Sequence, residues 1–162
     1  MTDPELDALA HRLGDTLTAR GWCLATAESC TGGWIATAVT AIGGSSAWFD
    51  RGFVTYSNEA KTDMLGVAPH TLATHGAVSE ATVREMAAGA LARSRAELSV
   101  AVSGIAGPTG GTAAKPVGMV CLAWAIKGRP LRSETLHFTG DRQSIRRQTV
   151  LRALHVLVEL AA

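Results

Sequence analysis

Residues 22–33 read WCLATAESCTGG, and this stretch decides how the rest of the chain can be arranged. The apolar run at 22–27 is typical of a short strand that is buried on both faces. Small and polar residues follow at once, and a helical pattern begins at Thr31 and continues to about residue 42. A buried strand that leads directly into a helix is the building unit of α/β folds, which bind ligands where strand gives way to helix.

The flanking segments continue this alternation of helix and strand. Helices are predicted at residues 4–20, 31–42, 57–65, from 79 to about 91 and 141–160, with a short turn near Pro69; strands are predicted at 22–27, 49–57, 98–103, 117–126 and 131–138. Helical crossovers predict parallel pairing of the first strands, and the turn at 128–130 predicts an antiparallel hairpin. We therefore expect an α/β protein, a three-layer α/β/α sandwich on a mixed, mostly parallel five-stranded sheet, formed by one domain spanning residues 1–162.

The composition favours a protein that acts on a small molecule. The 162 residues are 47% hydrophobic and 18% charged, with a net charge of +1 and no polybasic or acidic block, so neither nucleic acid nor a membrane is an expected partner. The three cysteines and five histidines show no metal-ligand spacing, and we expect neither a metal nor another cofactor. An odd number of cysteines fits a reducing, cytoplasmic setting, and the acidic N-terminus does not resemble a signal peptide.

Ser29 is the first candidate for chemistry. The start of a helix offers unpaired N–H groups and a partial positive charge. If Ser29 attacks a carbonyl group, the same donors are able to hold the developing oxyanion. The candidate donors and substrate contacts are the next four residues, Cys30, Thr31, Gly32 and Gly33. Spacing alone leaves open the simpler interpretation that Ser29 or Thr31 only caps the helix.

Lys61 is the second candidate, because the chain has only three lysines against twelve arginines. A lysine can serve as a base once its ammonium is destabilised, whereas an arginine stays protonated. Lys61 is predicted in the first turn of a helix, where the helix dipole disfavours a positive charge. Tyr56, the only tyrosine, ends the preceding strand and is able to hydrogen-bond the serine, the lysine or the substrate. A solvated surface lysine remains the alternative.

Two further segments are candidates for holding the rest of a substrate. A glycine-rich loop follows the strand at 98–103 and suits phosphate or ribose, although it matches neither dinucleotide-binding nor Walker patterns. Arg142 and Arg146 share one helix face and are able to clamp a phosphate. A mobile connection and solvated arginines are the respective alternatives. The candidate contacts in the loop are Ser103, Gly104, Ala106, Gly107 and Thr109.

Five ordered blocks together resemble a known family. They are TAESCTGG at 26–33, YSNEAK at 56–61, GAVS at 76–79, SGIAGP at 103–108 with KPVG at 115–118, and GDR at 140–142 with IR at 145–146. They span essentially the whole chain. The pattern closely resembles the nicotinamide-nucleotide amidase family, also known as the CinA C-terminal domain, in its stand-alone form.

This resemblance implies an α/β/α domain, usually a homo-oligomer, that converts nicotinamide mononucleotide to nicotinate mononucleotide and ammonia. It implies amide hydrolysis of a Ser–Lys type by Ser29 and Lys61, with Tyr56 and Ser46 nearby. In that mechanism, neutral Lys61 takes the proton of Ser29 during attack and later returns a proton to the departing ammonia, either directly or by way of Tyr56. The sequence leaves open whether Lys61 or Tyr56 is the general base.

Two alternatives to this activity stay open from the sequence. One is a nucleotide-binding module without catalysis, which would use the glycine-rich loops for phosphate. The other is a cysteine amidase that uses Cys30, although no histidine lies near Cys30 in the sequence to form the usual pair.

Overall fold

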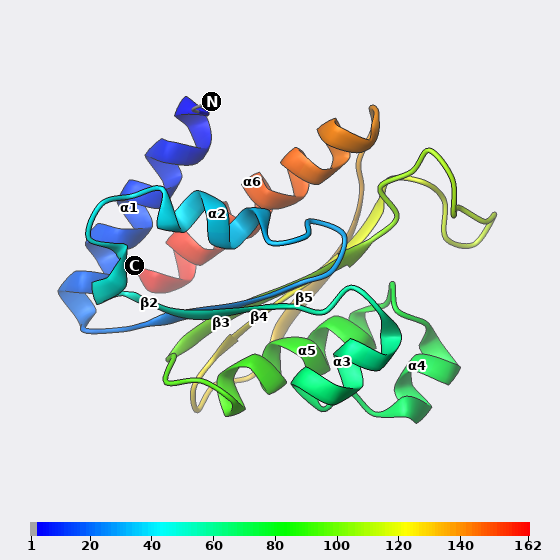
Figure 1. Ribbon diagram of the computed structural model, residues 1–162, viewed down its shortest axis with the longest axis horizontal. Helices are drawn as coiled ribbons and strands as arrows, with labels where there is room; N and C mark the ends of the chain where they lie inside the picture. Colours follow the sequence, from blue (N-terminus) through cyan, green and yellow to red (C-terminus); the bar gives the residue numbers. More distant parts are fainter. Residues whose placement is uncertain (1–2) are drawn as a thin grey trace.

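Five strands form the central sheet of the computed structural model, which describes residues 3–162 (Figure 1). They are β1 (Leu24–Glu28), β2 (Phe49–Val54), β3 (Leu98–Gly104), β4 (Met119–Ile126) and β5 (Arg132–His137). Their order across the sheet is β2-β1-β3-β4-β5. β1 pairs in parallel with β2 and β3, whereas β4 is antiparallel to both β3 and β5. Only β4 therefore runs against the other strands, which confirms the mixed, mostly parallel sheet.

Helices cover both faces of this sheet. They are α1 (Pro4–Arg20), α2 (Trp34–Thr40), α3 (Asn58–Leu65), α4 (Pro69–His75), α5 (Glu80–Ala92) and α6 (Arg142–Ala161), with a 3₁₀ turn η1 (Ser45–Ala47) before β2. Figure 1 shows α1, α2 and α6 on one face and α3, α4 and α5 on the other. The three-layer α/β/α arrangement is thus confirmed.

The side chains of β1 alternate between the two helical layers. Leu24 belongs to the core under α1 and α6, whereas Ala25 and Ala27 belong to the second core, under α5. Successive residues of a strand point to opposite faces of the sheet. This alternation carries Glu28 toward the α2 layer and the next residue, Ser29, toward the α3 layer.

The predicted helix at 31–42 is shorter than expected, because α2 begins only at Trp34. Gly32 and Gly33 have φ angles of 61° and 103°, which lie in the left-handed region that favours glycine. These two residues form a turn between the strand and the helix, and the turn leaves residues 29–33 as a separate loop.

A helix, α4, replaces the turn that the sequence predicts near Pro69. Its start is held by a residue distant in the sequence, Glu85 of α5. The Glu85 carboxylate accepts hydrogen bonds from the Ala68 amide at 2.9 Å and from the Thr71 hydroxyl. Pro69 at the first helical position is the one local signal for this helix, whereas the residue that caps it comes from another element.

Gly89 allows α3 and α5 to pack unusually closely. A Cβ atom at position 89 would lie 2.0 Å from the carbonyl oxygen of Leu65, a distance that no side chain tolerates. Leu65 is the last residue of α3, the helix that carries Lys61. The absence of a side chain at Gly89 therefore sets the position of Lys61 relative to the sheet.

Candidate active site

Ser29 and Lys61 are in direct contact, although they lie 32 positions apart in the sequence. Lys61 Nζ is 3.1 Å from Ser29 Oγ. It also donates hydrogen bonds to the carbonyl oxygens of Thr55 at 3.0 Å and Tyr56 at 3.2 Å. The Lys61 side chain is only 1% exposed. The structure thus places the two predicted catalytic residues together and buries the amine.

The parallel pairing of β1 and β2 brings the two residues together. The carboxyl ends of parallel neighbours meet at the same edge of a sheet. The Thr55 amide donates to the Glu28 carbonyl at 2.9 Å, so the segments that contain β1 and β2 stay paired up to the residue before Ser29. Ser57 then caps the start of α3, and Lys61 lies in the first turn of that helix.

Burial lowers the pKa of Lys61 below the ordinary lysine value of 10.5, because the loss of water disfavours the charged ammonium. Its hydrogen-bond partners within residues 3–162 are two backbone carbonyls and the Ser29 hydroxyl, and no carboxylate lies among them. The position near the start of α3 also disfavours a positive charge. Lys61 is therefore suited to accept the proton of Ser29 as a neutral amine.

Cys30, the alternative nucleophile, is poorly suited to attack. Its thiol is buried, and this burial raises its pKa to about 12. The thiolate is the reactive form of cysteine, so a thiol with this pKa stays protonated and inert near neutral pH. The geometry favours Ser29, which hydrogen-bonds Lys61, whereas no hydrogen bond joins the Cys30 thiol to Lys61 within residues 3–162.

Glu28 occupies the start of α2, where the sequence predicts amides free for a substrate. Its carboxylate accepts hydrogen bonds from the amides of Ile35 at 2.8 Å and Ala36 at 3.0 Å, and from the Thr31 hydroxyl at 2.6 Å. The pKa of Glu28 is raised because burial outweighs these hydrogen bonds. The start of α2 is thus capped from within the protein, and the Ile35 and Ala36 amides are not free to hold a substrate.

The loop before α2 retains two candidate oxyanion donors. The Gly32 amide donates to the Ser29 carbonyl at 3.0 Å, and the Gly33 amide helps to hold Glu28. Within residues 3–162, neither the Cys30 amide nor the Thr31 amide donates to a backbone carbonyl. Of the four amides that the sequence predicts, these two remain available to a developing negative charge.

A cavity of about 210 Å³ opens beside the Ser29–Lys61 pair. Eight predicted site residues line it: Ser29, Cys30, Tyr56, Lys61, Ser103, Gly104, Ala106 and Arg142. Three residues with no predicted role complete the wall: Asn58, Ala77 and Val78. These three residues belong to the blocks YSNEAK and GAVS, which carry the family resemblance. Their side chains gave no chemical reason to predict a role for them.

Tyr56 contacts the reacting pair through its backbone rather than its phenol. Its carbonyl oxygen accepts from Lys61 and, at 3.4 Å, from the Ser29 hydroxyl. The side chain is 62% exposed at the edge of the cavity, and its hydroxyl accepts a hydrogen bond from Arg142 Nη2 at 3.4 Å. Arg142 Nη1 also donates to the Gly107 carbonyl at 2.8 Å. Tyr56 and Arg142 thus lie together on one side of the cavity.

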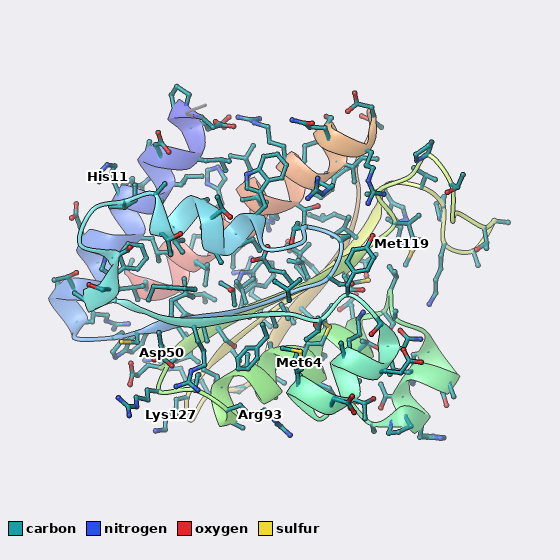
Figure 2. The ribbon with its side chains drawn as sticks, in the orientation of Figure 1. His11, Asp50, Met64, Arg93, Met119 and Lys127 are labelled. Carbon is teal, nitrogen blue, oxygen red and sulfur yellow. The ribbon has the colours of Figure 1, made fainter. Side chains whose placement is uncertain are left out.

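Ser46 lies away from this cavity, which corrects the expectation that it is near Ser29. It belongs to η1, just before β2, and the start of β2 is aligned with the start of β1. Ser29 follows the end of β1. In Figure 2, Asp50 and Lys127 mark the end of the sheet near η1, whereas Met119 lies at the other end. The two serines are separated because parallel strands keep their starts and ends apart.

Six other predicted contacts also lie outside the cavity wall: Thr31, Gly32, Gly33, Gly107, Thr109 and Arg146. Thr109 is exposed in the glycine-rich loop. Arg146 points to the backbone of the Ser29 loop, where it donates to the carbonyls of Cys30 and Thr31, both at 3.0 Å. The structure therefore leaves Arg142 as the arginine that faces the cavity.

Residues 3–162 contain neither a candidate membrane span nor a candidate metal cluster. No helix in this part of the chain has both the length and the apolar composition that a membrane crossing requires. Across the same residues, the His, Cys, Asp and Glu side chains form no group of three or more that is able to hold a metal ion.

Comparisons with known proteins point to one family. Residues 6–161 match the family described as the CinA C-terminal domain. A relative named nicotinamide-nucleotide amidohydrolase PncC from Escherichia coli K12 is 55% identical, over 97% of this chain and 95% of that protein. A relative of the same name from Pseudomonas putida is 52% identical, over 98% of both chains. These relatives are nearly the same length as this chain.

Solved structures show the same fold. The competence/damage inducible protein CihA from Agrobacterium tumefaciens is 50% identical and superposes with a TM-score of 0.98, over 100% of this chain and 99% of that one. A CinA superfamily protein from Klebsiella pneumoniae is 44% identical, with a TM-score of 0.92 over 96% and 97% of the two chains.

Proposed function

The chain belongs to the CinA C-terminal domain family. From this membership we propose that the protein hydrolyses an amide, with Ser29 as the nucleophile and Lys61 as the base. The observation that supports this proposal is the 3.1 Å contact between Lys61 Nζ and Ser29 Oγ, beside a cavity. A buried amine of lowered pKa next to a hydroxyl is the arrangement that an activated serine nucleophile requires.

The protein is a nicotinamide-nucleotide amidohydrolase. Relatives of that name are 51–56% identical over nearly their full length. The reaction converts nicotinamide mononucleotide and water to nicotinate mononucleotide and ammonia.

The first half of the reaction forms an acyl-enzyme. The hydroxyl oxygen of Ser29 attacks the carboxamide carbon while neutral Lys61 accepts the hydroxyl proton. The carbonyl oxygen of the substrate becomes negatively charged, and the amides of Cys30 and Thr31 stabilise it. When the C–N bond breaks, protonated Lys61 returns the proton to the leaving nitrogen, which departs as ammonia. The Tyr56 phenol is not needed as a relay, because Lys61 contacts Ser29 directly.

The second half releases the acid. A water molecule takes the place of ammonia and attacks the acyl carbon, while Lys61, neutral again, accepts a proton from it. The bond to Ser29 breaks and the serine recovers its proton. The products are the carboxylic acid and the resting enzyme, so one water is consumed for each ammonia released.

Incubation of the purified protein with nicotinamide mononucleotide tests the proposal. We expect ammonia and nicotinate mononucleotide to appear in equal amounts, measured by a coupled ammonia assay and by chromatography. The Ser29→Ala variant should produce neither product while it still binds the nucleotide. Nucleotide binding by the wild type without ammonia release would support the non-catalytic binding module instead.

Arg142 is proposed to hold the phosphate of the nucleotide, because it is the arginine that faces the cavity. We expect Arg142→Ala to raise KM by roughly ten- to a hundredfold, with a smaller effect on kcat, since one charge-assisted contact is lost far from the amide. Steady-state kinetics with nicotinamide mononucleotide measure this effect.

Nicotinamide riboside, which lacks the phosphate, is the control substrate. The Arg142→Ala effect should largely disappear with it. Tyr56→Phe controls for the lost contact to the Tyr56 hydroxyl. Equal losses with both substrates would show that Arg142 only holds the Gly107 loop in place.

We further propose that the protein is a cytoplasmic homo-oligomer, as the family resemblance implies. Two observations support this. Val54, the last residue of β2, and Tyr56, two residues later, are exposed large apolar side chains, a surface suited to contact with another copy. All three cysteines are free thiols, which fits a reducing compartment.

A further inference from the structure

Arg146 of α6 binds the backbone of the loop that carries Ser29. Its Nε donates to the carbonyl of Cys30 and its Nη2 to the carbonyl of Thr31, both at 3.0 Å. Its guanidinium lies 5.5 Å from the ring centre of Trp34, the first residue of α2. The planar guanidinium thus links the helix on one face of the sheet to both carbonyls that follow the nucleophile.

The carbonyl directions determine the amide directions in this loop. In a trans peptide unit, the C=O and N–H groups point in opposite directions. Because Arg146 holds the Cys30 carbonyl toward α6, the Thr31 amide of the same peptide unit points away from α6. Within residues 3–162 this amide donates to no backbone carbonyl.

The Thr31 carbonyl, the second group that Arg146 binds, fixes the direction of the Cys30 amide indirectly. Arg146 holds the Thr31 carbonyl, and the amide of that unit, Gly32 N–H, donates to the Ser29 carbonyl at 3.0 Å. The Ser29 carbonyl is thereby fixed, and with it the direction of the Cys30 amide. Both amides that are candidates for the oxyanion therefore depend on the same guanidinium.

The reacting groups lie on the opposite side of the loop from Arg146. Lys61 approaches Ser29 from α3, which covers the other face of the sheet from α6 (Figure 1). Amides that point away from α6 thus point toward the side from which Lys61 reaches Ser29. Carbonyl oxygens on that side would repel the oxyanion, whereas amides stabilise it.

We propose that Arg146 is a positioning residue that aims the Cys30 and Thr31 amides at the oxyanion formed when Ser29 attacks the substrate. This inference rests on the proposed Ser29 mechanism. It replaces the sequence-based expectation that Arg146 clamps the phosphate. Lysine cannot fully substitute, because a single ammonium lacks the planar fork that holds two carbonyls at once.

Arg146→Ala tests the proposal by its effect on kcat. We expect kcat to fall by about 100-fold, because oxyanion donors are worth about 10²–10³ in kcat and small misplacements are enough to lose that contribution. KM should change by less than about threefold, since Arg146 does not line the cavity. Arg146→Lys should give an intermediate kcat, and the pH at which activity appears should not move, because Lys61 is unchanged.

Arg147→Ala is the matched control. Arg147 is the next residue of α6, and its guanidinium pairs with Asp3 and Glu5 rather than with the Ser29 loop. Its loss should leave kcat unchanged even if the melting temperature falls. Circular dichroism at the assay temperature confirms that each variant is folded.

Nicotinamide riboside separates the proposal from a phosphate contact. Because the oxyanion forms on the amide, Arg146→Ala should lower kcat/KM by the same factor with the phosphate-free riboside as with the nucleotide. A loss seen only with the nucleotide, and expressed in KM, would overturn the proposal in favour of phosphate binding. An Arg146→Ala variant with wild-type kcat would overturn it as well.

A second readout does not depend on the natural substrate. A small uncharged fluorophosphonate reacts with an activated serine and develops negative charge on its oxygen, so Arg146→Ala should slow phosphonylation of Ser29 by a similar factor. If the wild type is phosphonylated at Ser29 but hydrolyses no nucleotide, the protein is not a nicotinamide-nucleotide amidohydrolase. The rate of Ser29 phosphonylation in Arg146→Ala then decides the role of Arg146 by itself. A wild-type Ser29 that does not react at all would overturn both proposals.

Discussion

Replacing Ser29 with alanine is expected to lower kcat by at least about 10³-fold, because removal of the nucleophile closes the covalent route. Replacing its neighbour Cys30 with alanine should leave kcat within about threefold of the wild type, a change of less than 1 kcal/mol in the activation barrier. The reason for the contrast is structural. Ser29 Oγ contacts Lys61 Nζ at 3.1 Å, whereas burial raises the pKa of the Cys30 thiol to about 12.

The pair of variants is more informative than a thiol reagent. Alkylation of Cys30 places a bulky group on the cavity wall beside Ser29 and would block either nucleophile. Steady-state ammonia release compares the two variants, and mass spectrometry of a quenched reaction locates the acyl group on a peptide. Full activity in Ser29→Ala together with loss in Cys30→Ala would reverse the assignment.

Lys61→Arg is expected to be almost as inactive as Lys61→Ala, with kcat lowered by about 10²–10⁴-fold, the usual contribution of a general base. Arginine keeps the positive charge but does not deprotonate in proteins, so it cannot accept the Ser29 proton. A lysine that acts only through its charge would be partly replaced by arginine.

The pH dependence of the wild type gives the same assignment a second test. Burial lowers the pKa of Lys61, and only the neutral amine is a base. Activity should therefore be lost as the pH falls through this lowered pKa and should be regained as the pH rises through it. The midpoint of this rise in activity should lie below the ordinary lysine pKa of 10.5. The residual activity of Lys61→Ala should not show this pH-dependent rise.

Binding and folding controls decide how a loss is interpreted. The guanidinium is bulkier than an ammonium, and Lys61 is 1% exposed, so calorimetry must show normal nucleotide binding by Lys61→Arg. If that variant binds normally and keeps about a tenth or more of the wild-type kcat, Lys61 is not the base, since such a loss is only about 1.4 kcal/mol. The Tyr56 hydroxyl would then be the next candidate.

Local signals in the sequence were sufficient to predict most of the fold. Asp3 before Pro4 predicts the start of α1, and the structure shows the Asp3 carboxylate accepting the Leu6 amide. Gly21, with a φ of 67°, ends the same helix as predicted. Caps of this kind act within a few residues of the chain, so they can be identified without knowledge of the tertiary structure.

The candidate site was predictable only in part. The blocks around Ser29 and Lys61 predict both residues through the family resemblance, whereas their spacing leaves capping and solvation as alternatives. Ser46 was predicted from the same resemblance and lies elsewhere in this chain. Glu28 showed no signal, because its role depends on amides of α2 that come within reach only after the loop at Gly32 and Gly33 has turned.

The sequence by itself determined the order of helices and strands, the buried character of β1 and the position of Ser29 at its end, because these depend on periodicity and caps between near neighbours. Only the tertiary structure decided which groups Ser29 meets. The contact with Lys61 requires the pairing of β1 with β2 and the close packing of α3 on α5 at Gly89. Arg146 of α6 reaches the Ser29 loop, where it binds the Cys30 carbonyl, 116 positions away in the sequence. Such contacts depend on how helices and strands pack against one another. This packing cannot be predicted from the spacing or composition of one segment.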